Sequence, residues 1–383
     1  MKYFSFHPAV YPNMLRAVSP DAGPGDLVHV MDKEGQLFGS GFFNPNARVP
    51  LRVLQHGEEP LTEEKLDARL DAALDLRLNT LRLNDTTDAW RAVHSDGDGL
   101  SGLVVDRYAD VLSIEVTTLG IWRRLRRWLP RLHEKLGTKQ HVIQTDPDIA
   151  RIEAMRWADV PEADDPAPRS IRIRENGVRY QVNFEDGHKT GFFCDQRDNR
   201  FSFAGLARGD VLDACCYTGG FSLNVLQHGE PRSVTAVDLD EQAVEAARGH
   251  AKLNQHQARL KLVHADVFDW MRQVHAAERR FDSIVLDPPK FIADRTLVEK
   301  GEAKYHDLNR LALKLLRPGG LLLTCSCSGL LPAARLVELV RTAARKEGRD
   351  ASLLAVSGAA PDHPVGLECP ETEYLKALWL RVW

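Results

Sequence analysis

The sequence predicts an α/β protein whose C-terminal half is a doubly wound parallel sheet. From about residue 185, short apolar runs alternate with amphipathic segments, beginning with "DVLDACC", "GGFSLNVLQHG" and "SVTAVDLD", and strands that alternate with helices build parallel sheets. Polar residues or glycines follow these apolar runs, at the carboxyl ends of strands, where ligands bind in such sheets. Before this half, β-branched runs separated by turns predict two smaller, strand-rich domains.

The first domain is predicted to be small and β-rich, over residues 1–72. The stretch "GDLVHVMDKEGQLFGSGFFNPNARVPLRVL" alternates strand-like runs with two polar turns, a pattern typical of a small barrel or sheet. The next stretch, "EEPLTEEKLDARLDAALDLRLNTL", has apolar residues at helical spacing and few helix breakers. It therefore predicts a helix.

The second domain, residues 73–184, is predicted to be α+β in the order strand, strand, helix, strand, strand. "GLVVDRYADVLSIEVTT" reads as a hairpin and "GIWRRLRRWLPRLHEKLG" as a helix. We expect a break near Pro130, because proline removes a helical hydrogen bond. "HVIQTD" predicts a further strand, and "RSIRIRENGVRYQVNF" predicts a second hairpin that completes the domain.

The third domain, residues 185–383, continues the alternation to the end of the chain. After the first two strands, "LKLVHADVF", "FDSIVLDPP" and "LLLTCSCS" predict strands. Between them, "EAKYHDLNRLALKLLRPGG" predicts a helix with a Pro-Gly-Gly stop. The helix "LPAARLVELVRTAARKEG" and strands near "ASLLAVS" and "EYLKALWLRVW" close the domain.

The composition, 43% apolar and 27% charged, is that of a globular protein. A net charge of −4 gives no global attraction to nucleic acid, so any such surface must be local. No apolar run approaches the roughly 20 residues of a membrane span, and "MKYFSFHPAV" lacks a secretory signal. We therefore expect a cytoplasmic protein with no membrane partner.

The cysteines have no usual metal-ligand spacing, so we expect reduced thiols and no metal. They are Cys194, Cys215, Cys216, Cys325, Cys327 and Cys369.

The first two strand ends of the third domain carry acids and glycines. After the first come Asp213, Gly219 and Gly220; the glycines would admit a ligand close to the backbone, or merely form a tight turn. The second strand ends in Asp238, about 25 residues beyond Asp213, near the spacing of a ribose-binding carboxylate. The alternative for Asp238 is a helix N-cap, which Asp240 would supply equally well.

The remaining strand ends add further polar groups. Asp266 follows the third strand and could accept a hydrogen bond from an adenine amino group. The fourth strand ends in "DPPK", Asp287 to Lys290, whose prolines fix a rigid loop, and the fifth ends in Cys325 and Cys327. Together these ends indicate a site for an adenosine-bearing cofactor, with a reactive centre where the last two meet.

A series of stretches then carries a family resemblance: "HSDGDGLSGLVVDRY", "GHKTGFFCDQRDNR", "CYTGGFS", "VDLDEQAVEAAR", "LDPPKF", "SCSGL" and "DHPV". The last domain resembles the Rossmann-like fold of class I S-adenosylmethionine-dependent methyltransferases. The whole chain resembles the bacterial 23S ribosomal RNA cytosine-C5 methyltransferases that carry an N-terminal PUA RNA-binding domain. The first quarter matches more loosely, through the pattern HP-x-V at residues 7–10.

The resemblance implies S-adenosyl-L-methionine as the cofactor and 23S ribosomal RNA as the partner, and it leaves a homodimer open. Four residues would line the methionine side of the cofactor: Asp213, Tyr217, Gly219 and Gly220. Asp238 would hold the ribose and Asp266 the adenine. The stretch "KTGFFCDQR", with Lys189, Gln196 and Arg197, would fold over the cofactor or the substrate.

The resemblance also implies a covalent mechanism. The thiolate of Cys327 would add to C6 of cytosine and make C5 nucleophilic, whereas Cys325 reads as a small buried hydrophobe. Asp287 would contact the base edge near N3. Many related enzymes have a second cysteine where this chain has Lys290, so the group that removes the C5 proton stays open. Lys290 would hold a phosphate or the base, or would be an exposed loop lysine.

A basic cluster on the helix of the second domain is the local candidate for phosphate contact. Its members are Arg123, Arg124, Arg126, Arg127, Arg131, Lys135 and Lys139, interleaved with Trp122 and Trp128. The alternative is the solvated face of an amphipathic helix.

Two other functions compete with cytosine-C5 methylation. Asp-Pro-Pro also resembles the loop of RNA amino-group methyltransferases acting on adenine or guanine, which usually place an aromatic residue directly after the second proline. Here Lys290 stands before Phe291. The other alternative is a non-catalytic RNA-binding assembly factor with a methyltransferase fold.

Overall fold

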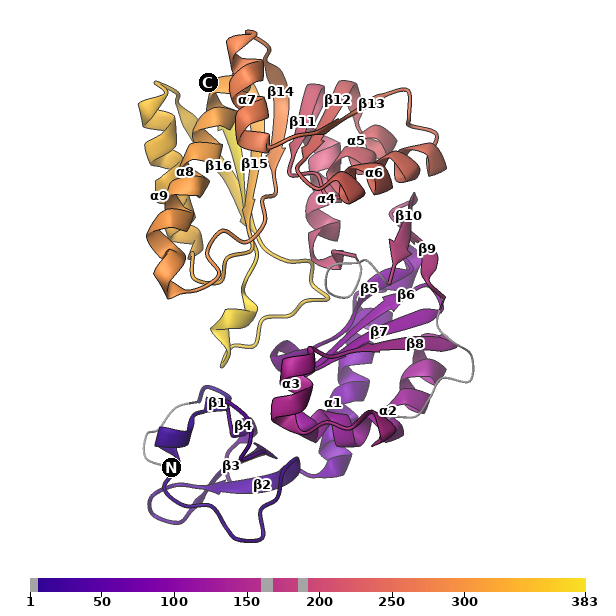
Figure 1. Ribbon diagram of the computed structural model, residues 1–383, viewed down its shortest axis with the longest axis vertical. Helices are drawn as coiled ribbons and strands as arrows, with labels where there is room; N and C mark the ends of the chain where they lie inside the picture. The colour runs from indigo at the N-terminus through magenta and orange to yellow at the C-terminus, as the bar shows by residue number, and fades with distance from the viewer. Residues whose placement is uncertain (1–5, 160–167, 185–191) are drawn as a thin grey trace. The chain divides into compact units, whose positions relative to one another are not determined.

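The computed structural model describes residues 6–159, 168–184 and 192–383, and its elements fall into two compact units (Figure 1). Unit 1 comprises residues 1–174, 182–194 and 361–372, and unit 2 comprises residues 175–181, 195–360 and 373–383. The chain therefore returns to unit 1 near its C-terminus. Within the described ranges, no helix is long and apolar enough to cross a membrane.

The N-terminal sheet of unit 1 is small, as predicted, and its strands are antiparallel. Its strands lie in the order β1 (Ala9–Val10), β4 (Leu51–His56), β3 (Leu37–Phe43) and β2 (Asp26–Met31). Inward side chains such as Val10, Phe43 and Val53 form its core. Buried and partly exposed residues alternate over the first four positions of β4, which is the period of two that a half-buried strand requires.

The second sheet of unit 1 contains a strand, β5, that the sequence did not predict. Its order is β5 (Ala89–His94), β6 (Leu103–Tyr108), β7 (Val111–Val116) and β8 (Gln140–Gln144). The sequence did not predict β5, because the charged residue Arg91 interrupts its run of apolar residues. In the structure the Arg91 guanidinium donates to both carboxylate oxygens of Asp106 on β6, at 2.5 and 3.1 Å.

The predicted second hairpin forms, but it does not join this sheet. β9 (Ser170–Glu175) and β10 (Val178–Asn183) make a two-stranded sheet of their own. The expected strand-strand-helix-strand-strand sheet is therefore corrected to β5-β6-β7-β8 plus a separate hairpin.

Three helices accompany the second sheet: α1 (Glu63–Asp75), α2 (Leu119–Leu136) and α3 (Pro147–Glu153). The hydroxyl of Thr62 caps α1 by accepting from the Lys65 N–H at 3.4 Å. α2 runs unbroken through Pro130. The expected break is wrong because the apolar side of α2 is anchored in the core on both sides of the proline, for example by Trp128 and Leu132.

Unit 2 is built on a seven-stranded sheet in the order β13-β12-β11-β14-β15-β17-β16. The strands are β11 (Arg208–Ala214), β12 (Glu230–Asp238), β13 (Leu260–His264), β14 (Phe281–Leu286), β15 (Leu316–Ser326), β16 (Ala351–Ser357) and β17 (Lys376–Val382). β11 to β15 are parallel, and β17 runs antiparallel to both β15 and β16. The order reverses between β11 and β14, which is where doubly wound sheets bind ligands.

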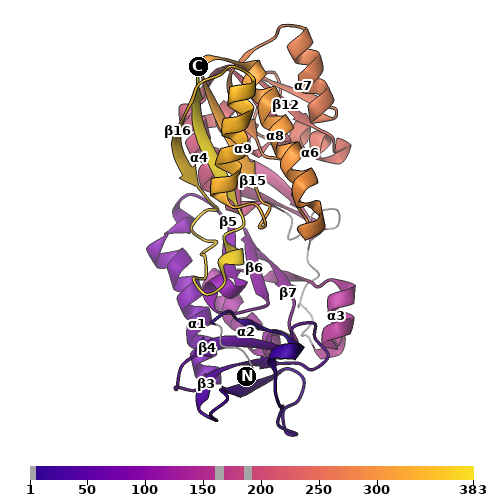
Figure 2. The ribbon, with the colours of Figure 1, turned by 90° about the vertical axis from the view of Figure 1, so that its left-hand side faces the viewer.

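Six helices complete unit 2: α4 (Arg197–Leu206), α5 (Gly220–His228), α6 (Glu241–Leu253), α7 (Val267–Ala276), α8 (Val298–Leu315) and α9 (Ala333–Lys346). α4 packs on α5, while α8 lies between α7 and α9 (Figures 1 and 2). One core of unit 2 joins these last three helices to the sheet, with Leu286, Tyr305 and Leu322 fully buried. The predicted α/β fold class is confirmed.

The returning segment of unit 1 brings two distant sequence motifs together. Asp362 of "DHPV" is fully buried, accepts the Arg91 N–H at 2.9 Å, and accepts the Arg77 guanidinium on its carbonyl at 2.6 Å. Gly97 of "HSDGDG" approaches this segment so closely that a Cβ would lie 2.1 Å from the Pro364 carbonyl oxygen. Only glycine fits there.

Candidate active site

The carboxyl ends of the parallel strands of unit 2 converge around Cys215, just beyond β11. Burial and the negative charges of four carboxylates raise the pKa of this thiol well above its usual range. The four are Asp238, Asp287, Asp213 and Asp266. The structure thus gathers all the acidic residues that the sequence singled out at the strand ends.

Asp213 is the innermost of these acids. It is fully buried, and its Oδ2 accepts from the backbone N–H of Ser222 at 3.0 Å and from the Ser222 hydroxyl at 2.7 Å. Its Oδ1 is buried and has no hydrogen-bond partner among the residues that the structure describes. Burial raises the pKa of Asp213 to about 6. A buried carboxylate oxygen left unpaired fits a site that a polar ligand completes.

The glycines after β11 serve helix packing as well as the turn. Gly219 has φ +83°, and a Cβ there would lie 3.3 Å from the Ala247 side chain of α6. A Cβ on Gly220 would lie 2.9 Å from Cδ of Arg200 in α4. The sequence suggested that the ligand itself needs this space. In the structure, protein side chains already occupy part of it.

Asp238 organises this turn. Its Oδ2 accepts from the backbone N–H of Tyr217 at 2.7 Å, and its Oδ1 accepts from the N–H of Asp240 at 2.9 Å. Asp240 is the N-cap of α6, accepting from two backbone N–H groups. The capping alternative for Asp238 is therefore wrong. Each oxygen of Asp238 keeps a lone pair with which to accept a ribose hydroxyl.

Asp266 does cap a helix. Its side chain accepts from the Asp269 N–H at 3.1 Å, at the start of α7. The capping bond occupies Oδ1, so a ligand contact would fall mainly to the second oxygen.

Asp287 stands at the end of β14 beside the segment that precedes α4. Its Oδ1 accepts from Gln196 Nε2 at 3.0 Å, and its N–H donates to the Ala214 carbonyl at 3.2 Å. Burial, followed by the nearby charge of Asp195, raises the pKa of Asp287 to about 7. This carboxyl is therefore part protonated near neutral pH, so that it can donate as well as accept a hydrogen bond.

From the stretch "KTGFFCDQR", the structure brings Gln196 to this centre. Gln196 bonds to Asp287, whereas the Nε of buried Arg197 donates to Asp198 at 3.0 Å. Lys189 lies outside the described residues.

The two neighbouring cysteines have different surroundings. Cys325 lies within β15 and is fully buried, and burial raises the pKa of its thiol well above the usual range. Cys327 is partly exposed, one residue past the end of β15. Lys290, on the loop after β14, is exposed. None of the cysteines in the described ranges forms a disulfide.

Sequence reasoning missed the residues that fix the backbone around Cys327. The Ser328 hydroxyl accepts from the Ile292 N–H at 3.2 Å and pairs with the hydroxyl of Tyr305 at 2.9 Å. Lys376 donates to the Ser328 carbonyl at 2.7 Å and is only 4% exposed. Its position at the head of the apolar strand "KALWLRV" was the signal that could have revealed it, because lysine is seldom buried without a partner.

The predicted basic cluster in unit 1 is largely neutralised by acids of α1. Arg124 and Arg127 both pair with Glu63, and Arg131 pairs with Asp71. Arg131 in turn lowers the pKa of Asp71. The two tryptophans interleaved with the arginines are buried in the core, so they cannot stack on bases.

Further ion pairs join Arg123 to Asp26 and Lys135 to Asp71. Within the described part of the chain, Arg126 and Lys139 are the exposed members of the cluster with no ion pair.

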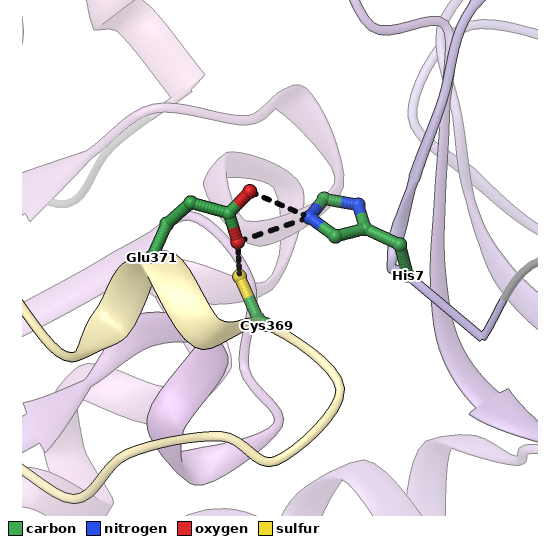
Figure 3. A group of neighbouring side chains, drawn as sticks. All are labelled: His7, Cys369 and Glu371. Atoms are coloured by element: carbon green, nitrogen blue, oxygen red, sulfur yellow. Dashed lines mark hydrogen bonds and ion pairs between the residues drawn. The ribbon is translucent and has the colours of Figure 1, made fainter. Parts of the chain in front are cut away.

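A separate group in unit 1 has donor types that suit a metal, namely His7, Cys369 and Glu371 (Figure 3). The Glu371 carboxylate lies 3.1 and 3.2 Å from His7 Nε2 and accepts from the Cys369 thiol at 3.6 Å. These side chains satisfy one another as a hydrogen-bonded cluster. They lie in the other unit from the strand ends, and the chemistry of that site does not use them.

The fold and the strand-end acids define an S-adenosylmethionine-dependent methyltransferase of class I. The profile of the S-adenosylmethionine-dependent methyltransferase family matches residues 162–354, and that of the PUA-like domain matches residues 2–56. The chain belongs to the family of ribosomal RNA large subunit methyltransferase I.

Relatives of that name cover nearly the whole chain. The protein of Alteromonas mediterranea is 34% identical over 380 residues, 98% of this chain and 95% of that protein. The protein of Pseudoalteromonas atlantica is 32% identical over 381 residues, with 98% and 95% covered. Among solved structures, SMU.776 complexed with SAH has a TM-score of 0.78 at 22% identity, covering 93% of this chain and 91% of that one. This last likeness shows the fold.

Proposed function

We propose that this protein transfers a methyl group to C5 of a cytosine in 23S ribosomal RNA, through a covalent adduct with Cys327. The observation that carries the proposal is the position of Cys327. Its thiol stands just past the end of β15 and is partly exposed. Ser328, the residue after Cys327, accepts a hydrogen bond on its hydroxyl from the N–H of Ile292, in the loop that begins at Asp287.

The strand-end residues are assigned to the cofactor as follows. Asp238 accepts the ribose hydroxyls, Asp266 faces the adenine, and Tyr217 with the two glycines of the turn lines the methionine part. The unpaired Oδ1 of Asp213 supports a polar contact at the centre of the site. Bound S-adenosyl-L-methionine supplies an electrophilic methyl group on its sulfonium. Arg197 and Lys189 are also proposed to contact the cofactor, but neither is assigned to a particular atom of it.

The residues of this chain perform the other steps. The Cys327 thiolate adds to C6 of the cytosine, and the electron pair of the C5–C6 double bond moves toward N3. Asp287, with its raised pKa, donates a hydrogen bond or proton at N3 and so stabilises that charge. After methylation, loss of the C5 proton to a base re-forms the double bond and expels the thiolate. Lys290, exposed on the adjacent loop, is assigned to the RNA phosphate beside the target base.

The target base must leave its stack to reach a pocket at the strand ends. The N-terminal PUA-like domain is assigned to RNA binding. An rRNA substrate favours action in the cytoplasm, and the proposed steps use no metal. All the catalytic groups belong to one chain, so a homodimer is not required for chemistry.

The division into residues 1–72, 73–184 and 185–383 is likewise proposed as functional parts rather than as separable pieces. The first boundary falls within α1, whose buried Leu66 and Leu74 pack in the core of the second sheet. The second separates Glu175 from Arg200, with which it forms a buried ion pair. Experiments should therefore use the full-length chain.

The proposal is tested with full-length protein, unmodified 23S RNA and labelled cofactor. We expect 5-methylcytidine as the labelled nucleoside. Cys327→Ala should abolish transfer while cofactor affinity stays within about twofold, because the thiol acts on the base. The matched control, Cys325→Ala, removes a buried thiol two residues away and should keep substantial activity.

RNA carrying 5-fluorocytosine at the target has no removable C5 proton, so it should trap a protein–RNA adduct that peptide mapping places on Cys327. An adduct on Cys325 would reverse the assignment of the nucleophile. A labelled exocyclic amine without any adduct would replace the proposal by the amino-group alternative. Cofactor binding with no RNA methylated would favour the assembly factor.

A further inference from the structure

The segment around Cys327 contains a buried cation for which the reaction as described has no role. Lys376 is the first residue of β17, and its Cα pairs with that of Ser326, the residue before Cys327. Its ammonium donates to the Ser328 carbonyl at 2.7 Å and to the Tyr374 carbonyl at 2.9 Å. The two bonds hold the lysine head against the backbone on which Cys327 lies.

A lysine head held by two carbonyls still has a third N–H. Burying an ammonium with only neutral partners is unfavourable, so such a group calls for a nearby anion. The proposed nucleophile supplies one when it ionises, and the electrostatic influence of Cys327 reaches Lys376, where it raises the lysine's pKa against the lowering caused by burial. The attraction is reciprocal, so a lysine cation must also favour the thiolate.

Among the described residues, several other charged or titratable groups act on this pair or lie beside it. Glu373, just before β17, favours the lysine cation, while Lys290 after β14 disfavours it. Tyr305 of α8 is buried and its hydroxyl bonds to Ser328, so it adds a dipole rather than a charge. Cys325 is buried with a thiol pKa raised far above its usual range, so it stays neutral. Of these described groups, Lys376 is the buried cation.

We propose that Lys376 is the positioning residue that activates Cys327, by holding the backbone at Ser328 and stabilising the neighbouring thiolate as its counter-ion. The thiol proton leaves to solvent, because Cys327 is a partly exposed residue, and the lysine keeps its own three protons. This inference rests on the proposed role of Cys327 as nucleophile. It requires neither RNA nor cofactor to be present.

The test is the pH profile of Cys327 alkylation by iodoacetamide in the full-length protein, followed by peptide mass spectrometry. Lys376→Met keeps the apolar stem and removes the charge. We expect it to raise the apparent pKa of the Cys327 thiol and to slow alkylation at pH 7 roughly tenfold, since an opposite charge nearby shifts a pKa by about one unit or more. Lys376→Arg keeps the charge and should largely restore the wild-type profile.

The matched control is Lys304→Met, which removes an exposed lysine of α8 next to Tyr305 and should leave the profile unchanged. Equal profiles for wild type and Lys376→Met, or the same loss in the Arg variant, would overturn the inference. If the Met variant fails to fold, the wild-type profile decides. The thiol pKa must lie below the value of about 8.5 of an unperturbed cysteine.

Because alkylation involves no methyl transfer, the two proposals fail separately. A lysine-dependent thiol pKa in a protein that forms no RNA adduct would sustain the inference and refute the proposed function. A trapped RNA adduct on Cys327, together with a thiol pKa that does not depend on Lys376, would support the proposed function and refute the inference.

Discussion

At the scale of single residues, the site contains carboxyl groups whose burial disfavours the ionised form. Asp213 and Asp287 have pKa values raised to about 6 and about 7, in both cases chiefly by burial. An acid with a raised pKa stabilises the fold while it is protonated. That stabilisation is complete below the unfolded pKa of about 4 and is lost as the pH rises through 6 to 7.

Asp287→Asn should remove one such pH dependence. Between pH 5 and pH 8 the wild-type protein should lose on the order of 2 kcal/mol of unfolding free energy through Asp287, and the Asn variant should not. Urea unfolding of both proteins at the two pH values measures the difference. An identical loss in both would mean that Asp287 titrates normally in the folded protein.

Asp238 gives a second residue-scale prediction. Asp238→Asn keeps one oxygen to accept a turn N–H but removes the charge that receives the ribose hydroxyls. Hydrogen bonds to a charged group contribute about 1.5–3 kcal/mol, so calorimetry should show cofactor affinity reduced about 10- to 100-fold.

Asp240→Asn is the matched control, since it removes a charge from the cap of α6 and leaves the Asp238 carboxylate in place. It should leave affinity near wild type. Equal affinities for the Asp238 variant and wild type would remove Asp238 from the site.

At the scale of elements, the hairpin β9-β10 is fastened to α4 by one ion pair. Arg200 donates through Nε and a terminal nitrogen to the two oxygens of Glu175, at 2.8 and 2.6 Å, and both side chains are buried. Such a pair is costly to break, because removing one partner leaves the other as a buried, uncompensated charge.

Glu175→Leu should therefore lower the unfolding free energy by about 3–5 kcal/mol. The double variant Glu175→Leu with Arg200→Met should recover much of that loss, since no buried charge is left. Denaturant unfolding of the cycle measures both effects.

The exposed pair Arg151–Asp148 provides the comparison, because breaking it should cost less than about 1 kcal/mol. A Glu175→Leu loss no larger than this would show that the hairpin is held by its apolar contacts.

Elements with a clear period or stop signal were predictable from the sequence. The strand-turn-helix at Asp213 and the helix N-cap at Asp240 both follow from local patterns. What failed depended on partners distant in sequence. β5 was not predicted because Arg91 interrupts its apolar residues, and the charge of Arg91 is paired only when Asp106 lies beside it in the fold. The arginines of α2 looked like a phosphate-binding surface because the acids that pair with them lie on α1. Lys376 was overlooked because Ser328 lies 48 residues away.

At the scale of the whole molecule, the ion pairs between α1 and α2 change what RNA binding should look like. The salt dependence of RNA affinity reflects only those cationic side chains that are available to contact phosphates. Arg126→Ala with Lys139→Ala should therefore weaken RNA binding and flatten its salt dependence, by a slope of up to about 2. Arg131→Ala should alter thermal stability more than affinity.

RNA affinity titrated from low to high salt measures the slope. If Arg131→Ala weakens RNA binding more than the double variant Arg126→Ala with Lys139→Ala does, RNA displaces the acids of α1 from their arginines.

The return of residues 361–372 to unit 1 has a consequence for synthesis on the ribosome. Asp362 supplies the acceptors for Arg77 and for the N–H of Arg91, yet it is translated long after both of them. Unit 1 therefore cannot acquire its full set of contacts while the nascent chain is growing, although most of it emerges first. A premature stop after residue 354 would deprive the earliest-made part of the protein of its last contacts, as well as removing β17. Both units should therefore reach their full set of native contacts only after residues 361–383 have been synthesised.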